Sequence, residues 1–217
     1  MAGNAALGWA YLGQRDKTAA ASVEVTSVKG ERVAAALAGV KRPDRERAWG
    51  PDAEFALLYR LIVEQGLRLS EAYRQRVAGI DFERRLIHVE GSKGHRGRAR
   101  PRVMPIAPSL LADLQAWCTG RVGLLFGYWD GTPEGRRRAT GALSARFRTL
   151  FGYAQVPDFT EHDLRHQATV QWLLTRDKAG RWAFTELEIC RFMGWSDPKM
   201  MLRYASVRGE QWAERLG

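Results

Sequence analysis

The sequence predicts a mostly helical α+β domain with one small antiparallel sheet. Apolar residues recur at helical spacing in several segments, and Pro, Ser or Thr stands where most of these segments begin. A strand-like run at residues 86–89 is followed by a Gly- and Arg-rich stretch and by a second run that ends at Pro105, which is typical of a β-hairpin. The chain has 217 residues, 45% of them hydrophobic, so it can bury a sizeable core.

The first clear helix is expected between Pro51, which suits a first helical turn, and Gly66, which suits a helix end. Four apolar residues of this segment share one helical face, namely Phe55, Leu58, Leu61 and Ile62. Ser70 can cap a second, short helix that runs to about Val77.

The rest of the chain alternates between expected helices and loops. Helices are expected over residues 108–117, 142–153 and 160–174, after Thr185, from Asp197 through Tyr204, and over 207–216. Residues 127–138 and 175–183 are expected to be loops, because they are polar and contain Gly. Near the start of the chain, the Ala-rich segment 32–40 can form a short helix.

The charge of the chain points to a polyanionic partner. Lys and Arg total 34 against 24 Asp and Glu, which gives a formal net charge of +10. Nucleic acid is the first candidate, and an anionic membrane surface is the second. A membrane span is not expected, since the best apolar run, residues 55–63, is interrupted by Arg60. The N-terminus lacks the pattern of a secretory signal.

The two cysteines, Cys118 and Cys190, predict neither a disulfide framework nor a metal site. Their spacing to other potential ligands matches no metal-binding pattern. We therefore expect two reduced thiols in a cytoplasmic protein.

Five short segments carry the chemistry. In chain order they are GLRLSEA at residues 66–72, Lys93 at the expected hairpin tip, HDLRH at 162–166, the pair Gly194-Trp195, and Tyr204 nine residues beyond Trp195. Each alone has an ordinary explanation, such as a solvated arginine, a surface lysine or a packing tyrosine. Their joint occurrence in this order favours one functional site.

Together these segments resemble the tyrosine recombinase family, also called phage integrases of the lambda type. The resemblance covers residues 51 to about 210 and implies the catalytic-domain fold of that family, with its small antiparallel sheet. It further implies site-specific recombination or integration of DNA, as in mobile elements, through a 3′-phosphotyrosyl intermediate. Neither a metal nor ATP nor another cofactor is implied. The implied partner is double-stranded DNA, bound by a homotetramer on paired sites in the cytoplasm, at the nucleoid.

The resemblance also assigns catalytic roles. Arg68 and Arg165 stabilise the negative charge that builds up on the attacked phosphorus, since a guanidinium binds two phosphate oxygens and stays protonated. Tyr204 is the nucleophile, and His162 assists the loss of its proton. Lys93 is the general acid for the leaving 5′-oxygen. Trp195 stands where many relatives have a histidine, and its indole N–H can donate a hydrogen bond but cannot accept a proton.

Other residues are expected to support this set. Glu71 and His166 are expected to orient the arginines and the active-site helix without being catalytic. A basic stripe in the hairpin is expected to contact DNA phosphates, and it consists of Arg96, Arg98, Arg100 and Arg102. The basic run at residues 136–138 is either a second phosphate contact or a solvated loop.

The N-terminal part of the chain departs from the family pattern. We expect residues 1–48 to be a remnant or linker of a missing DNA-binding domain and residues 49–217 to be the catalytic domain. Two alternative functions remain open from the sequence. One is a truncated DNA-binding regulator that lacks recombination activity, and the other is a type IB topoisomerase-like enzyme without site preference.

Overall fold

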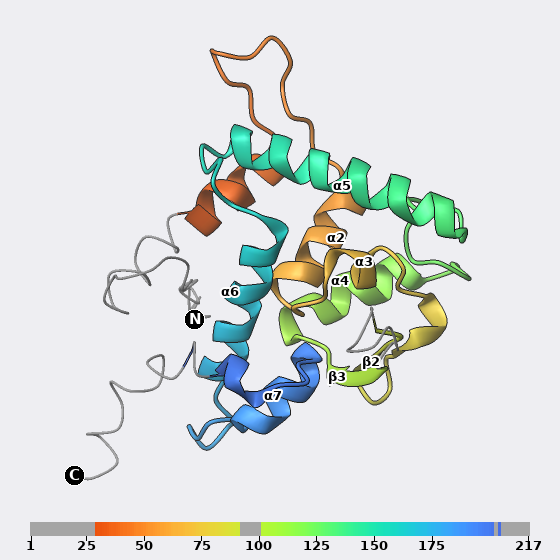
Figure 1. Cartoon of the computed structure of the whole chain (residues 1–217), viewed down its shortest axis with the longest axis vertical. Helices are drawn as coiled ribbons and strands as arrows, with labels where there is room; N and C mark the ends of the chain where they lie inside the picture. Colours follow the sequence, from red (N-terminus) through yellow and green to blue (C-terminus); the bar gives the residue numbers. More distant parts are fainter. Residues whose placement is uncertain (1–28, 92–100, 202–203, 205–217) are drawn as a thin grey trace, which may run out of the picture.

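The computed structural model describes residues 29–91, 101–201 and 204, and these form a mostly helical α+β fold with one three-stranded antiparallel sheet (Figure 1). The predicted fold class is thereby confirmed. A helix at residues 29–37 precedes the named elements. These are α2 (Ala53–Val63), α3 (Leu69–Ala72), the 3-10 helix η1 (Val77–Gly79), β1 (Ile80–Asp81), β2 (Leu86–Val89), β3 (Arg102–Pro105), α4 (Pro108–Cys118), α5 (Pro133–Tyr153), α6 (Glu161–Leu174) and α7 (Glu186–Met193).

Helix α2 forms the centre of the domain. The Asp52 side chain accepts a hydrogen bond from the backbone N–H of Phe55 at 3.0 Å, so Asp52 is the N-cap and Pro51 lies just outside the helix. The helix packs against α6, and both contribute to a single hydrophobic core. Figure 1 shows α5 crossing one end of this pair, while the sheet and α7 lie toward the other end.

The predicted hairpin is confirmed. Strand β2 pairs with β1 on one side and β3 on the other, and the register places Ile87 opposite Met104. Both of these side chains are buried, so the sheet turns one face to the core. The tip of the hairpin, residues 92–100, lies outside the described residues, and with it lie Lys93, Arg96, Arg98 and Arg100.

Two helices differ in extent from the prediction. Helix α5 begins at Pro133, so residues 133–138 are helical and not a loop, because Thr132 caps the N–H of Gly135 and Pro133 suits the first position. The helix predicted from Ser70 to about Val77 is shorter in the structure. Helix α3 ends at Ala72, and Arg68 is its N-cap residue.

The two helices that carry or flank the C-terminal motifs start where the sequence predicts. Thr160 caps α6 and Thr185 caps α7, each through a capping box with an acidic residue three positions on. Helix α7 ends at Gly194, whose φ of 62° is the left-handed conformation that favours glycine. Residues 198–201 form a 3-10 turn, and the predicted helix over 207–216 lies outside the described residues.

The described part of the N-terminal segment packs on the same core as the rest. Val33 and Ala36 of the helix at residues 29–37 are buried in it. Val40 forms a β-bridge with Trp49, and the Tyr153 hydroxyl donates to the carbonyl oxygen of Arg47 at 2.5 Å. Residues 29–48 are therefore packed as part of this domain, while the division at residue 48 stays a prediction.

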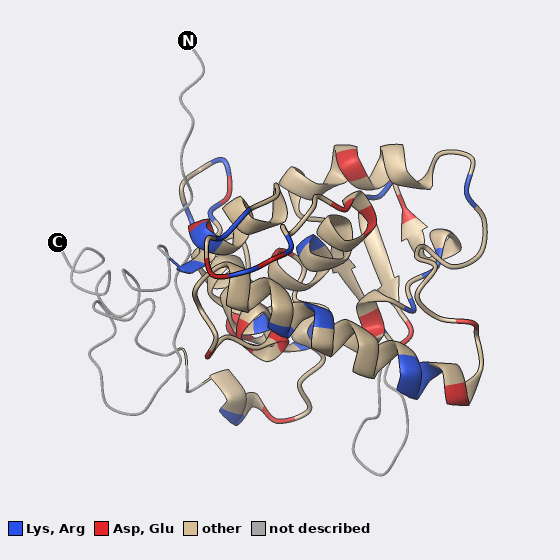
Figure 2. Cartoon of the chain, turned by 90° about the horizontal axis from the view of Figure 1, so that it is seen from above, with Lys and Arg blue, Asp and Glu red and all other residues tan. Residues whose placement is uncertain are grey.

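Charged residues are distributed over several elements of the described surface (Figure 2). Among the described residues, no helix combines the length and the apolar character that crossing a membrane requires.

Candidate active site

Glu71 of α3 is the centre of the candidate site. Its carboxylate is fully buried and accepts two hydrogen bonds from Arg68, from the backbone N–H at 2.9 Å and from Nη1 at 2.8 Å. The Arg68 side chain itself is 38% exposed, so one side of this pair faces solvent. The GLRLSEA segment therefore folds back on itself, and its glutamate fixes the arginine.

Arg102 at the start of β3 contacts the same carboxylate. Its Nη1 and Nη2 donate to Oε1 and Oε2 of Glu71 at 3.0 and 2.7 Å, which is a bidentate pair. The Arg102 side chain is only 7% exposed. The sequence predicts a DNA phosphate contact here, and the structure places this guanidinium inside the domain.

Arg165 of α6 is the third arginine at Glu71, and Arg68, Arg102 and Arg165 are called the arginine cluster below. Arg165 is 4% exposed, and its Nη1 lies 3.9 Å from Oε2 of Glu71. Its two terminal nitrogens donate to the backbone carbonyls of Gly66 and Met193. Burial lowers the pKa of Arg165 to about 9, with the positive charge of Arg68 acting in the same direction, so the group stays protonated at neutral pH.

The pKa of Glu71 moves the opposite way from that of an isolated buried acid. Burial alone would raise it, but hydrogen bonds and charge from Arg102, then from Arg68, hold the pKa well below its usual range. Glu71 is therefore ionised at any pH at which the protein works.

The arginine cluster also contacts the end of α7. Three consecutive backbone carbonyls there accept hydrogen bonds from the cluster. Arg102 donates to the carbonyl oxygen of Phe192 at 2.5 Å, and Arg165 donates to that of Met193. Arg68 donates to the carbonyl oxygen of Gly194 at 3.4 Å. The last carbonyls of a helix have no partner within the helix, and cations are favoured there. The cluster thus fixes the backbone that leads directly into Trp195.

Tyr204 lies against this backbone. Its ring stacks on Trp195 with centroids 5.6 Å apart and planes 16° apart, and the residue is only 2% exposed. Its hydroxyl shares a hydrogen bond with Nδ1 of His166. The ring of His162, one helical turn away, meets the ring of His166 edge-on at 4.5 Å.

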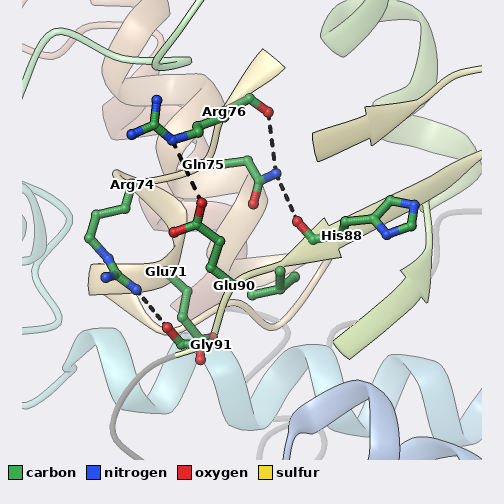
Figure 3. A pocket seen from close by; sticks show the side chains of 8 residues that line it. Glu71, Arg74, Gln75, Arg76, His88, Glu90 and Gly91 are labelled. Atoms are coloured by element: carbon green, nitrogen blue, oxygen red, sulfur yellow. Dashed lines mark hydrogen bonds and ion pairs between the residues drawn. The ribbon is translucent and has the colours of Figure 1, made fainter. Parts of the chain in front are cut away.

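A small pocket lies on the sheet side of Glu71 (Figure 3). Arg74 donates to the carbonyl oxygen of Gly91 at 2.6 Å, and Arg76 lies 3.6 Å from Glu90. Gln75 donates to the carbonyl oxygen of His88 at 3.1 Å. The segment after α3 therefore holds the end of β2, where the chain enters the hairpin tip.

The structure brings together most of the residues that the sequence predicts for the site, namely Arg68, Glu71, His162, Arg165, His166, Trp195 and Tyr204. Two placements differ from expectation. His166, which the sequence predicts only as an orienting residue, shares a hydrogen bond with the Tyr204 hydroxyl. Arg102 joins the cluster, and strand alternation could have indicated this, since Met104 two residues on is buried on the same face.

Potential metal ligands do not form clusters in the described part of the chain. Among these residues, no group of three or more His, Cys, Asp or Glu side chains is arranged to hold a metal ion. The site is instead built from arginines, aromatic rings and histidines.

Arginines beside a buried tyrosine, on this fold, are the features expected of a tyrosine recombinase catalytic domain. Comparison with known sequences leads to the same class of protein. The pattern of the phage integrase family matches residues 51–211, so the chain belongs to that family and the predicted resemblance is confirmed. A 65-residue stretch is 40% identical to tyrosine recombinase XerA of Thermococcus onnurineus, which is 30% of this chain and 22% of that protein.

Solved structures of tyrosine recombinases share the fold. The crystal structure of XerA recombinase superposes with a TM-score of 0.58 at 15% identity, covering 86% of this chain and 62% of the other. The structure of XerH bound to palindromic difH has a TM-score of 0.55 at 17% identity, and the match covers 87% of this chain and 50% of XerH. The structure of the Tn1549 integrase with transposon right end DNA has a TM-score of 0.54 at 20% identity, and the match covers 88% of this chain and 65% of the integrase. The chain thus spans less than two thirds of each of these proteins.

Proposed function

We propose that this protein is a site-specific DNA recombinase or integrase that cleaves and rejoins strands through a 3′-phosphotyrosyl intermediate. One observation carries the proposal. A buried arginine and a half-exposed arginine meet at the end of α7, and the backbone they fix leads into the Trp195 ring that stacks on Tyr204. This arrangement supports phosphate binding and a nucleophile in one place.

In the proposed reaction, the Tyr204 hydroxyl oxygen attacks a backbone phosphorus and the 5′-oxygen leaves. Arg68 and Arg165 take the growing negative charge on the phosphate oxygens, and Trp195 offers an indole N–H. Lys93 gives the leaving oxygen its proton, as the family resemblance implies. Attack by a 5′-hydroxyl on the phosphotyrosine reverses these steps. The bond energy is kept, so neither ATP nor a metal is required.

The tyrosine proton needs an acceptor. A hydrogen bond between nucleophile and base is the usual sign of an activated nucleophile, and here it joins Tyr204 to His166. This contact supports His166 as an acceptor of the tyrosine proton, beside the role that the family resemblance implies for His162. His162 is exposed beside it, which suits a contact with the DNA phosphate.

The proposed partner is double-stranded DNA, bound by a homotetramer on paired recombination sites in the cytoplasm, at the nucleoid. The net charge of +10 supports a polyanionic partner. The XerH and Tn1549 structures, which share the fold, hold DNA. Sedimentation of the protein with and without site DNA tests the assembly, and a single protomer per site pair would contradict the tetramer.

A covalent-trapping assay tests the proposed function. The full chain is mixed with nicked DNA from either side of its own gene, without ATP and with EDTA, beside Tyr204→Phe. We expect an adduct that resists denaturation, is linked to a 3′-phosphate, and is absent from the variant. An adduct that survives in Tyr204→Phe would exclude this nucleophile.

Two other results would favour the alternative functions. A gel shift without any adduct, on DNA that spans the whole element, would indicate a binding regulator. Relaxation of supercoiled plasmids without site preference would indicate a topoisomerase.

A further inference from the structure

We propose that Arg102 is a positioning residue of the cleavage reaction, which occupies the Glu71 carboxylate so that Arg165 stays available to a DNA phosphate. This inference rests on the proposed function and adds a residue to it. The catalytic set that the family resemblance implies does not include Arg102, and the sequence predicts a DNA phosphate contact at this position.

The geometry of the bidentate pair carries the first step. Arg102 covers both oxygens of Glu71 at 2.7 and 3.0 Å, while Arg165 stays 3.9 Å away from the nearer one. The Glu71 side chain is 0% exposed and Arg102 is 7% exposed, so water does not compete for the pair. Arg165 donates to two backbone carbonyls instead of to the carboxylate.

Charge gives the second step. A buried carboxylate must be paired, and without Arg102 the charged partners of Glu71 that the structure shows are Arg68 and Arg165. Arg68 already pairs with Glu71 at 2.8 Å, so Arg165 is the group that would be drawn toward the carboxylate and away from an incoming phosphate. The low pKa of Glu71 agrees with a leading role for Arg102. Burial opposes ionisation of the carboxyl group, and Arg102 makes the largest contribution in favour of it.

The third step links Arg102 to the nucleophile. Its Nε donates to the carbonyl oxygen of Phe192 at 2.5 Å, and a Cβ placed on Gly194 would lie 3.2 Å from the Arg102 side chain. The residue therefore spans from the carboxylate to the end of α7, next to Trp195. The Arg102 side chain thus holds the Glu71 carboxylate at a fixed distance from the backbone at the end of α7.

A double-mutant cycle tests the proposal. Single-turnover cleavage at saturating nicked DNA is measured for the wild type, Arg102→Met, Glu71→Gln and the combination. We expect Arg102→Met to slow cleavage by roughly 10- to 100-fold, the range of coupling within one network, while the DNA Kd changes little. In the combined variant the carboxylate is gone, so at least part of the rate should return.

A pH profile adds a readout that a purely structural role would not move. In Arg102→Met the strongest hydrogen-bonding partner of Glu71 is lost, so its pKa rises. Cleavage by this variant, relative to the wild type, should increase as the pH falls through that titration. The effect should be absent when Gln replaces Glu71.

The controls separate this inference from folding and from the proposed function. Arg84→Met removes an exposed arginine, 72% exposed and paired with Asp81, and should leave cleavage unchanged. If Arg102→Met melts below the assay temperature, Arg102→Lys takes its place in the cycle, with a smaller loss expected. Losses that simply multiply, with no rescue and no pH effect, overturn the positioning role. Absence of an adduct in the wild type would overturn the proposed function instead.

Discussion

The arginine cluster and the arginines at the start of α5 use the same side chain in opposite settings. In the cluster, the side chains of Arg165 and Arg102 are buried and are fixed by a carboxylate and by backbone carbonyls. At the start of α5, Arg138 is 73% exposed and pairs with Asp130, which is itself 46% exposed. A guanidinium is thus held rigidly in one region and solvated in the other.

Electrostatic interactions are strongest where the charges are buried and fixed. Charges that are desolvated and fixed before the substrate arrives act strongly on a transition state. Exposed charges are screened by salt and attract a polyanion without orienting it. The arginine cluster therefore suits catalysis and the α5 arginines suit attraction, and the following substitutions test that contrast.

Arg165→Ala should have the largest effect. In the proposed reaction Arg165 donates to the phosphate as negative charge develops, so its loss should slow adduct formation by about 10²- to 10³-fold. The rate is measured in single turnover at saturating DNA, and circular dichroism checks that the variant folds. A folded variant with cleavage near the wild-type rate would remove Arg165 from the mechanism.

Glu71→Gln should lower stability in a pH-dependent way. The folded-state pKa of Glu71 is depressed, so its contribution is fully present above its ordinary value of 4.5 and is lost as the pH falls through the lowered pKa. Breaking a buried pair costs about 3–5 kcal/mol, so we expect a loss of this order in urea unfolding at pH 7. The gap to the wild type should narrow in acid, and a gap that is constant down to pH 3 would contradict the assignment.

Replacing Arg136 and Arg137 together by Ala should weaken DNA binding moderately. These residues line a surface pocket with Trp129 and Arg74, which suits a phosphate contact. Each lost phosphate contact should reduce the slope of log K against log salt by roughly 1. Fluorescence anisotropy over a salt series measures this, and an unchanged slope would assign the pair to a solvated surface.

Arg138→Ala should have the smallest effect. Its ion pair with Asp130 is exposed, so we expect a change of about 0–1 kcal/mol in the free energy of unfolding. Asp130→Asn serves as the partner variant in the same urea titration. A loss several times larger would show that exposure is a poor guide to the role of these arginines.

The sequence predicts the local features of this protein well. The caps at Thr160 and Thr185 and the strands of the hairpin follow from residues within a few positions of each other. The predicted start of α5 is wrong, because the polar run after Pro133 is typical of a loop. Thr132 and Pro133 together favour a helix start at this position.

What the sequence could not predict depends on contacts between distant segments. His162 and His166 lie one turn apart on the same helix, and only the fold decides which of them meets Tyr204. Arg102 was grouped with its neighbours in a basic stripe, yet its partner Glu71 is 31 residues earlier. The catalytic part of the site, Lys93 included, stays a prediction until the adduct is observed.

The arginine cluster also links the stability of the protein to its ligand. Three guanidinium groups surround one buried carboxylate, so positive charge exceeds negative charge within the cluster. Like charges repel one another, and this repulsion opposes the ion pairs with Glu71. A bound polyanion offsets the excess charge and stabilises the folded chain by mass action.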